Sequence, residues 1–195
     1  MPLPPSVSTR QLRHRRLVDV QVYARPDDLW EVDALLTDVK TRDVLLAGGV
    51  RAAGVPIHDM LLRLVVDRDL NILASGAESR HVPYPGACDE LGDSYGRLVG
   101  LNLLQGFRMA LRERVGGVLG CTHLTELAQV LPTAVVQAFA GEVIDTRGEA
   151  HDAPRPFQID RCHALRGDGP AVKTHYPRWY RAASDVAPTV APDPA

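Results

Sequence analysis

The chain has 195 residues, of which 45% are hydrophobic and 24% are charged. This length and composition fit a globular protein with a core of ordinary size. The formal net charge of −2 gives no whole-protein reason to expect nucleic acid or an anionic membrane as a partner. No apolar run is long enough to cross a bilayer. A small molecule is therefore the expected partner, and self-association is left open.

Three cysteines lie far apart, at positions 88, 121 and 162. Isolated cysteines in odd number are more typical of packing residues, metal ligands or nucleophiles than of disulfides. The N-terminus is rich in Pro and Ser and lacks the continuous apolar segment of a signal peptide. Together these features predict a cytoplasmic protein.

The first half of the chain predicts two β-hairpins. Apolar residues or apolar–polar alternation mark four strands, over residues 16–22, 30–36, 57–67 and 70–78. The second strand reaches Asp38 and Lys40, and a short strand over residues 44–46 is expected in the glycine- and alanine-rich loop that follows. The expected result is an antiparallel sheet of about four strands.

The second half predicts helices. Residues 82–88 contain two prolines and form a loop. Helices are then expected over residues 95–101, 104–115 and 121–139, the last bent or interrupted at Pro132. The fold class is α+β, with the sheet packed against C-terminal helices. We expect one domain over residues 12–181, between disordered tails at residues 1–11 and 182–195.

A glycine-rich turn before the longest helix presents the clearest candidate site. It brings Cys121 and His123 to the start of the helix, where Thr122 is a good N-cap. The positive end of the helix dipole favours the thiolate, which binds metals or attacks electrophiles. The imidazole two residues on is a second ligand or a base. The alternative is a buried packing cysteine beside a capping histidine.

Two further positions are candidates in the first half of the chain. His58 begins a strand and is a candidate ligand, with Asp59 as a second ligand or as the carboxylate that orients it. Local capping of the preceding loop by this pair is equally compatible. Cys88 is a candidate loop ligand. Asp38 and Lys40 end a strand, where solvation is the more common role and acid or base chemistry the alternative.

Cys162 and His163 repeat the pairing of thiol and imidazole near the C-terminus. Two such pairs could complete a tetrahedral Cys₂His₂ site, although their spacing is not that of a zinc finger. The chain has no glycine-rich phosphate loop, dinucleotide fingerprint, nucleophile-elbow serine or two-histidine metalloprotease helix. The commonest classes of soluble enzyme are thereby excluded.

Four stretches together resemble the bacterial family called domain of unknown function 2889. They are Pro-Ile-His-Asp-Met-Leu-Leu-Arg-Leu (56–64), Pro-Tyr-Pro-Gly-Ala-Cys (83–88), residues 112–127 around Gly-Cys-Thr-His, and Asp-Arg-Cys-His-Ala-Leu-Arg-Gly-Asp-Gly-Pro (160–170). The resemblance extends over about residues 12–181. It implies a family but no particular biochemical activity.

A more distant likeness concerns the order of the elements. A strand pair is followed by a loop with a cysteine and then by a helix that begins with a metal-ligand dipeptide. This order is similar to that of the U-type iron–sulfur scaffold proteins. Here Ile57 and His58 stand in place of the first cysteine-glycine, and Gly120 stands in place of the histidine before Cys121. The likeness implies that His58, Cys88, Cys121 and His123 converge at one end of the sheet.

These residues lead to hypotheses of different class. The first is a zinc- or iron-dependent enzyme, a lyase or hydrolase, because mixed His and Cys ligands suit these metals. Its metal would polarise a carbonyl or activate water, with Asp59 or His163 as proton carrier and Lys40 or Arg166 holding an anionic group.

An aromatic or acyl substrate is suggested by Tyr84, Trp179 and the arginines. In a metal-free version of the enzyme, Cys121 is the nucleophile and His123 or His163 the base. The second hypothesis is a non-catalytic carrier of a metal or an iron–sulfur cluster, and a purely structural zinc is the third.

Overall fold

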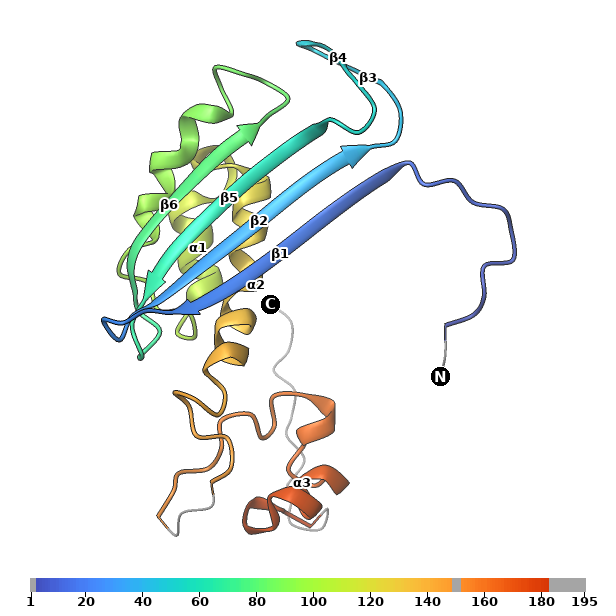
Figure 1. Ribbon diagram of the computed structural model, residues 1–195. Coiled ribbons are helices and arrows are strands. Elements are labelled where there is room, and N and C mark those ends of the chain that lie inside the picture. Colours follow the sequence, from blue (N-terminus) through green and yellow to red (C-terminus); the bar gives the residue numbers. More distant parts are fainter. Residues whose placement is uncertain (1–2, 149–151, 183–195) are drawn as a thin grey trace. The chain divides into compact units, whose positions relative to one another are not determined.

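The computed structural model describes residues 3–148 and 152–182 (Figure 1). The chain divides into two compact units, residues 1–138 and residues 139–195. Because each unit is described by itself, the single domain expected over residues 12–181 stays a prediction. Residues 3–13 are exposed and form no helix or strand. The expected C-terminal tail lies outside the described residues from position 183 onward.

The first unit is built on a four-stranded antiparallel sheet in the order β1-β2-β5-β6. Its strands are β1 (His14–Ala24), β2 (Trp30–Lys40), β5 (Pro56–Val66) and β6 (Ile72–His81). This confirms the predicted sheet of two hairpins. β1 extends two residues beyond the predicted range at each end, and β2 ends at Lys40 as predicted. β5 starts and ends one residue earlier than predicted, and β6 starts two residues later and ends three residues later.

A second, two-stranded sheet lies between β2 and β5 in the sequence. It pairs β3 (Val44–Leu46) with β4 (Gly49–Arg51). Only β3 was predicted. β4 was missed because it is three residues long and begins with Gly49, whose φ of 114° is a conformation that favours glycine.

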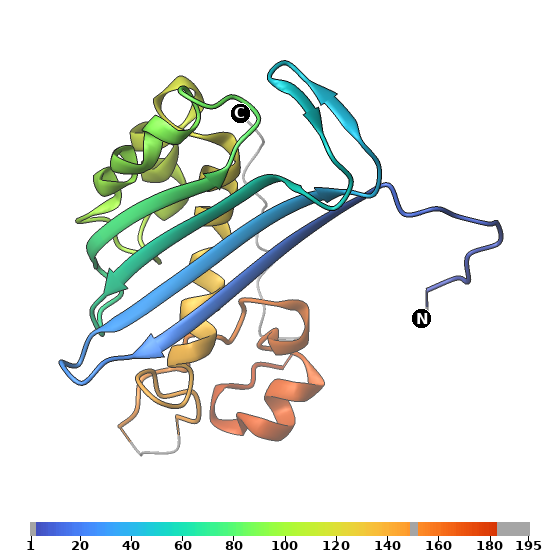
Figure 2. The ribbon, with the colours of Figure 1, turned by 45° about the horizontal axis from the view of Figure 1, so that its top comes forward.

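The helices of the first unit follow the sheet in the chain. They are η1 (Asp89–Leu98), α1 (Phe107–Val115), η2 (Gly117–Leu119) and α2 (Thr122–Phe139), which enters the second unit at its last residue. Figures 1 and 2 show them on one face of the sheet. The helix predicted over residues 95–101 is instead a 3₁₀ segment that starts earlier. α2 runs through Pro132 without being split.

The core of the first unit lies between the sheet and these helices. Alternate residues of β2 (Trp30, Val32, Ala34, Leu36) and of β5 (Met60, Leu62, Leu64, Val66) are buried. On α2 the predicted apolar stripe of Leu124, Leu127, Ala128 and Leu131 is buried as well. The apolar side chains that recur every second residue in the strands therefore pack against those that recur about every 3.6 residues in the helix.

In the described part of the second unit, all helices are short. They are η3 (His163–Leu165), α3 (Pro170–His175) and η4 (Pro177–Trp179). Asp160 ties them together by accepting hydrogen bonds from the backbone of Gly167 (2.6 Å) and from the guanidinium of Arg181 (2.6 Å). The Asp160 carboxylate therefore holds these short elements together.

Candidate metal centre

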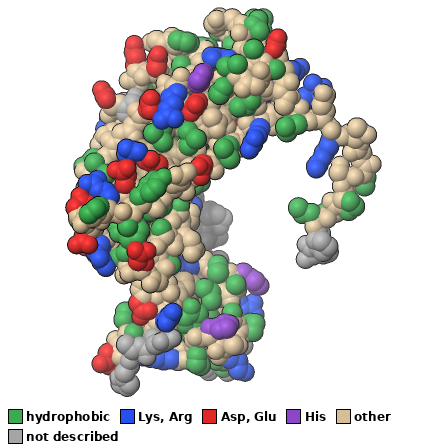
Figure 3. Space-filling view, in the orientation of Figure 1, with side chains coloured by type: hydrophobic (Ala, Val, Ile, Leu, Met, Phe, Trp, Pro, Cys, Tyr) green, Lys and Arg blue, Asp and Glu red, His purple; other side chains and the backbone are tan. Residues whose placement is uncertain are grey.

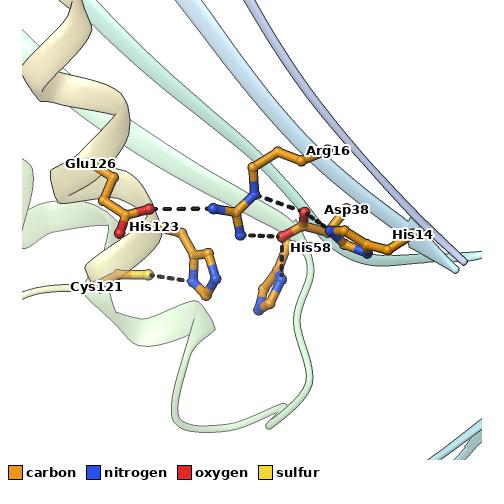
Figure 4. Close-up of polar contacts among 7 residues, drawn as sticks. All are labelled: His14, Arg16, Asp38, His58, Cys121, His123 and Glu126. Atoms are coloured by element: carbon orange, nitrogen blue, oxygen red, sulfur yellow. Dashed lines mark hydrogen bonds and ion pairs between the residues drawn. The ribbon is translucent and has the colours of Figure 1, made fainter. Parts of the chain in front are cut away.

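One end of the helix-covered face of the sheet carries polar side chains in place of apolar ones. In the sheet register, Asp38 of β2 lies opposite both Arg16 of β1 and His58 of β5. His14, two residues before Arg16, points to the same face. The N-terminus of α2 adds His123 and Cys121 (Figure 4). Four elements of the first unit therefore build one cluster.

Asp38 is the centre of this cluster and is buried, with 2% of its surface exposed. Its Oδ1 accepts from Arg16 Nε (2.8 Å) and lies 3.0 Å from His14 Nε2. Its Oδ2 accepts from Arg16 Nη2 (2.7 Å) and lies 3.0 Å from His58 Nδ1. Burial raises the pKa of Asp38, but the hydrogen bonds and positive charges of Arg16 and His58 outweigh burial and lower the pKa to about 2.

The solvated role expected for Asp38 is therefore wrong. Two residues before it, Leu36 is the last apolar member of the buried alternation of β2. Because the strand continues to Lys40, the same alternation carries Asp38 onto the buried face. The sequence signal was present, and extending the alternation by one more step would have found this residue.

His58 and His123 face each other across the cluster (Figure 4). Their ring centroids lie 3.8 Å apart. Since an ionised carboxylate can only accept, Nδ1 of His58 carries the proton that it donates to Asp38. In the neutral form of this imidazole, Nε2 is the unprotonated nitrogen, which can bind a metal or accept a proton.

His123 is held in its neutral form. Burial lowers its pKa, and the nearby His58 and Arg16 lower it further. One ligand atom from each of Asp38, His58 and His123 lies within 4.8 Å of the others. This spacing is compatible with a single metal ion between them.

Cys121 lies beside His123, with Sγ 3.9 Å from Nδ1 of the imidazole. The residue precedes α2, and its carbonyl accepts the first helical hydrogen bond, from the backbone of Thr125 (2.9 Å). Cys121 therefore occupies the cap position expected for Thr122, one residue earlier. The thiol stands at the positive end of the helix dipole, as predicted.

Tyr95 fixes the backbone at this point. Its side chain is fully buried, and its hydroxyl donates to the Cys121 carbonyl (2.8 Å) and accepts from the Cys121 amide (3.0 Å). A Cβ at Gly120 would lie 2.4 Å from the Val115 carbonyl and 3.1 Å from the Tyr95 hydroxyl. The glycine turn is thus required by close approach of two buried oxygens.

Tyr95→Phe is expected to lower the free energy of unfolding by about 2 kcal/mol, because it leaves the part-buried backbone N–H of Cys121 without its partner. Chemical denaturation measures this loss. The helix should also fray at Cys121, so the thiol should be alkylated faster than in the wild type. Equal stability and equal alkylation rates would contradict the anchoring role of Tyr95.

Arg16 links the sheet to α2. Besides its two bonds to Asp38, it places Nη1 3.3 Å from Oε2 of Glu126. The Glu126 side chain is 55% exposed and that of Arg16 is 39% exposed. The cluster therefore opens to solvent on the side of these two residues, although Asp38 itself is sealed.

Four of the predicted site residues have other surroundings. Asp59 points to the opposite face of the sheet from His58 and lies 3.8 Å from His81 Nδ1, so that Asp38 is the carboxylate that orients His58. Cys88 precedes η1 and donates its backbone N–H to Tyr84. Cys162 and His163 belong to the second unit. The described residues thus join His58, His123 and Cys121, and the other ligand assignments stay predictions.

Besides Asp38, two other residues of the cluster were not predicted from the sequence. His14 and Arg16 lie in the basic run of residues 13–16, which was not among the predicted site residues. Alternation within β1 separates them from Arg13 and Arg15 and turns both toward Asp38. No local pattern marks this role, because the carboxylate they bind lies on the next strand.

The fold and the cluster define an α+β protein with a histidine–carboxylate centre between a sheet end and a helix N-terminus. A family model matches residues 14–137, which is more than half of the chain. The protein belongs to that family, which is described as protein of unknown function (DUF2889).

No curated protein and no solved structure matches the chain. The likeness to U-type iron–sulfur scaffold proteins accordingly stays a prediction. Among the described residues, no helix has the length and apolar character needed to span a membrane.

Proposed function

We propose that the first unit binds one zinc or iron ion through His58 and His123, with the Cys121 thiolate as third ligand. The ion would serve a small-molecule reaction of the lyase or hydrolase class. The observation that carries the proposal is the pair of facing imidazoles, 3.8 Å apart, one of which is oriented by a buried carboxylate. A histidine held in this way by a carboxylate is a recurrent arrangement in metal sites.

Asp38 suits the role of an orienting group better than that of a ligand. Each of its oxygens already has two donor groups, from Arg16 and from a histidine. Cys121 is the proposed third protein ligand, because its Sγ lies 3.9 Å from Nδ1 of His123. Two imidazoles and a thiolate suit zinc or iron, and three protein ligands leave a coordination position for water or substrate.

The groups around the ion favour an enzyme over a carrier. Arg16, Glu126 and His14 surround the proposed ligands without being ligands themselves, as expected where a substrate must be oriented and a proton moved. Glu126 is exposed at the open side and is the nearest candidate proton carrier. The metal would activate a water or polarise a carbonyl.

A second candidate function rests on the contact between Cys121 and His123. At 3.9 Å, this thiol and imidazole could form a nucleophile and base without any metal, with His58 and Asp38 behind them. Both candidates use the same residues, and the metal content distinguishes them.

The deciding experiment is the metal content of protein purified without chelator, measured by mass spectrometry. We expect about one zinc or iron per chain in the wild type. His58→Ala should lose the ion and Cys121→Ala should hold less of it. His81→Ala is the matched control, because His81 lies beside Asp59 and outside the cluster, and it should keep the ion.

Each contrary outcome would favour a different interpretation of the cluster. A folded wild type without metal would overturn the metal proposal and favour the thiol nucleophile, which the alkylation rate of Cys121 against pH would then test. A coloured sample with iron and sulfide would favour the cluster carrier. Metal retained in His58→Ala would place the site elsewhere in the chain.

A further inference from the structure

We propose that two copies of the chain associate through the free edge of β1, pairing these strands antiparallel into one continuous sheet. This goes beyond the metal centre and is independent of it.

The backbone of β1 has an open side. Arg13 accepts from the amide of Thr41 (3.4 Å), and Arg25 donates to Leu29 (2.9 Å), so odd-numbered residues bond to β2. In an antiparallel pair the even-numbered residues then point their N–H and C=O groups outward. Among the described residues, no backbone hydrogen bond from another segment reaches this outer side of β1.

The opposite edge of the sheet is treated differently. Ile72 of β6 donates to Leu101 (2.8 Å) and accepts from Gly100 (2.8 Å), so the following chain covers the start of that edge. Natural proteins usually protect edges by such cover, by bulges, by proline or by charged side chains. β1 has no proline, and its pairing with β2 is continuous from His14 to Ala24 without a register shift.

Both faces of β1 carry exposed apolar side chains. Leu17 is 41% exposed, Val18 is 44% exposed and Tyr23 is 46% exposed. On the face of the sheet that Figure 3 shows, hydrophobic side chains are interspersed with charged ones. A long and regular edge with exposed apolar side chains is a template for pairing with another strand.

The charges select a second copy as the occupant. Arg15, Leu17 and Asp19 lie successively on the face away from the helices. In antiparallel self-pairing centred on Leu17, Arg15 of each copy faces Asp19 of the other, and the two Leu17 side chains meet. His14 and Arg16 do not oppose this pairing, because both are turned toward Asp38.

The same register satisfies the backbone. Arg16 of one copy lies opposite Val18 of the other, and both residues belong to the outward-bonding set. The two Leu17 residues then form a non-hydrogen-bonded pair, in which side chains are closest. Hydrogen bonding, apolar contact and charge therefore agree on one register.

Sedimentation equilibrium of the full chain tests the proposal, and we expect a wild-type dimer. Val18→Pro removes an outward N–H without touching the bonds to β2 and should give a monomer. Val18→Thr is the matched control and should stay dimeric. Circular dichroism establishes that each variant is folded. A monomeric wild type, or a folded Val18→Pro variant that still dimerises, would overturn the proposal.

Charge reversal and cross-linking test the register. Arg15→Asp or Asp19→Arg alone places like charges opposite each other twice and should weaken the dimer about tenfold. The double variant should recover the wild-type association. Leu17→Cys should form an intermolecular disulfide under mild oxidation. A dimer indifferent to both charge reversals, with no cross-link at position 17, would overturn this pairing.

Discussion

Asp38→Asn is expected to lower the free energy of unfolding by about 2 kcal/mol at pH 7. The pKa of Asp38 is about 2 in the folded chain, against 3.8 as its ordinary value. That difference corresponds to about 2 kcal/mol of stability from the ionised carboxylate. Asparagine keeps the shape of the side chain but loses the charge that Arg16, His14 and His58 surround.

The effect should depend on pH in one direction. The folded state binds the proton less readily than the unfolded state, so the contribution of Asp38 is complete above about pH 4. It is lost as the pH falls toward 2, through the folded pKa. Urea denaturation with chelator present, followed from pH 7 to pH 2, should show wild type and variant converging at the acid end.

Asp33→Asn is the matched control for this measurement. Asp33 lies on the same strand and forms a comparable two-bond pair with Arg63, but on the exposed face. Pairs of this kind contribute less than about 1 kcal/mol. A cost for Asp38→Asn no larger than that of Asp33→Asn would contradict the central role of the buried carboxylate.

His123→Ala is expected to raise the dissociation constant for zinc by more than about 100-fold. Loss of a group that only orients a ligand already costs about 10- to 100-fold in metal affinity, and His123 is proposed as a ligand itself. Burial lowers the pKa of His123, so its imidazole is neutral at pH 7 and protons compete little with the metal for it. Titration against a chromophoric chelator measures the constant.

Asp38→Asn should be intermediate in the same titration, because it leaves both imidazoles in place but removes the group that orients His58. His81→Ala should match the wild type. Equal affinity in wild type and His123→Ala would remove this residue from the metal centre. Equal affinity in wild type and Asp38→Asn would leave Asp38 with a role in stability alone.

Local patterns were sufficient for most of the fold. Alternation in residues 30–36 and helical spacing from Leu124 to Leu131 predicted elements that the structure confirms, because each pattern depends on neighbours along the chain. The segment η1 was predicted as a helix but not as a 3₁₀ helix, and the strand β4 was not predicted. Both lie in glycine-rich stretches, where side chains impose little preference on the backbone.

The candidate site was likewise predicted only in part. The sequence by itself determined the glycine turn, the position of Cys121 before a helix, and the choice of His58 and His123 as candidate ligands. Only the tertiary structure decided that Asp38, 20 residues from His58 in the chain, is the carboxylate that orients it. Strand pairing brings such residues together, and its register depends on turns and packing along the whole sheet.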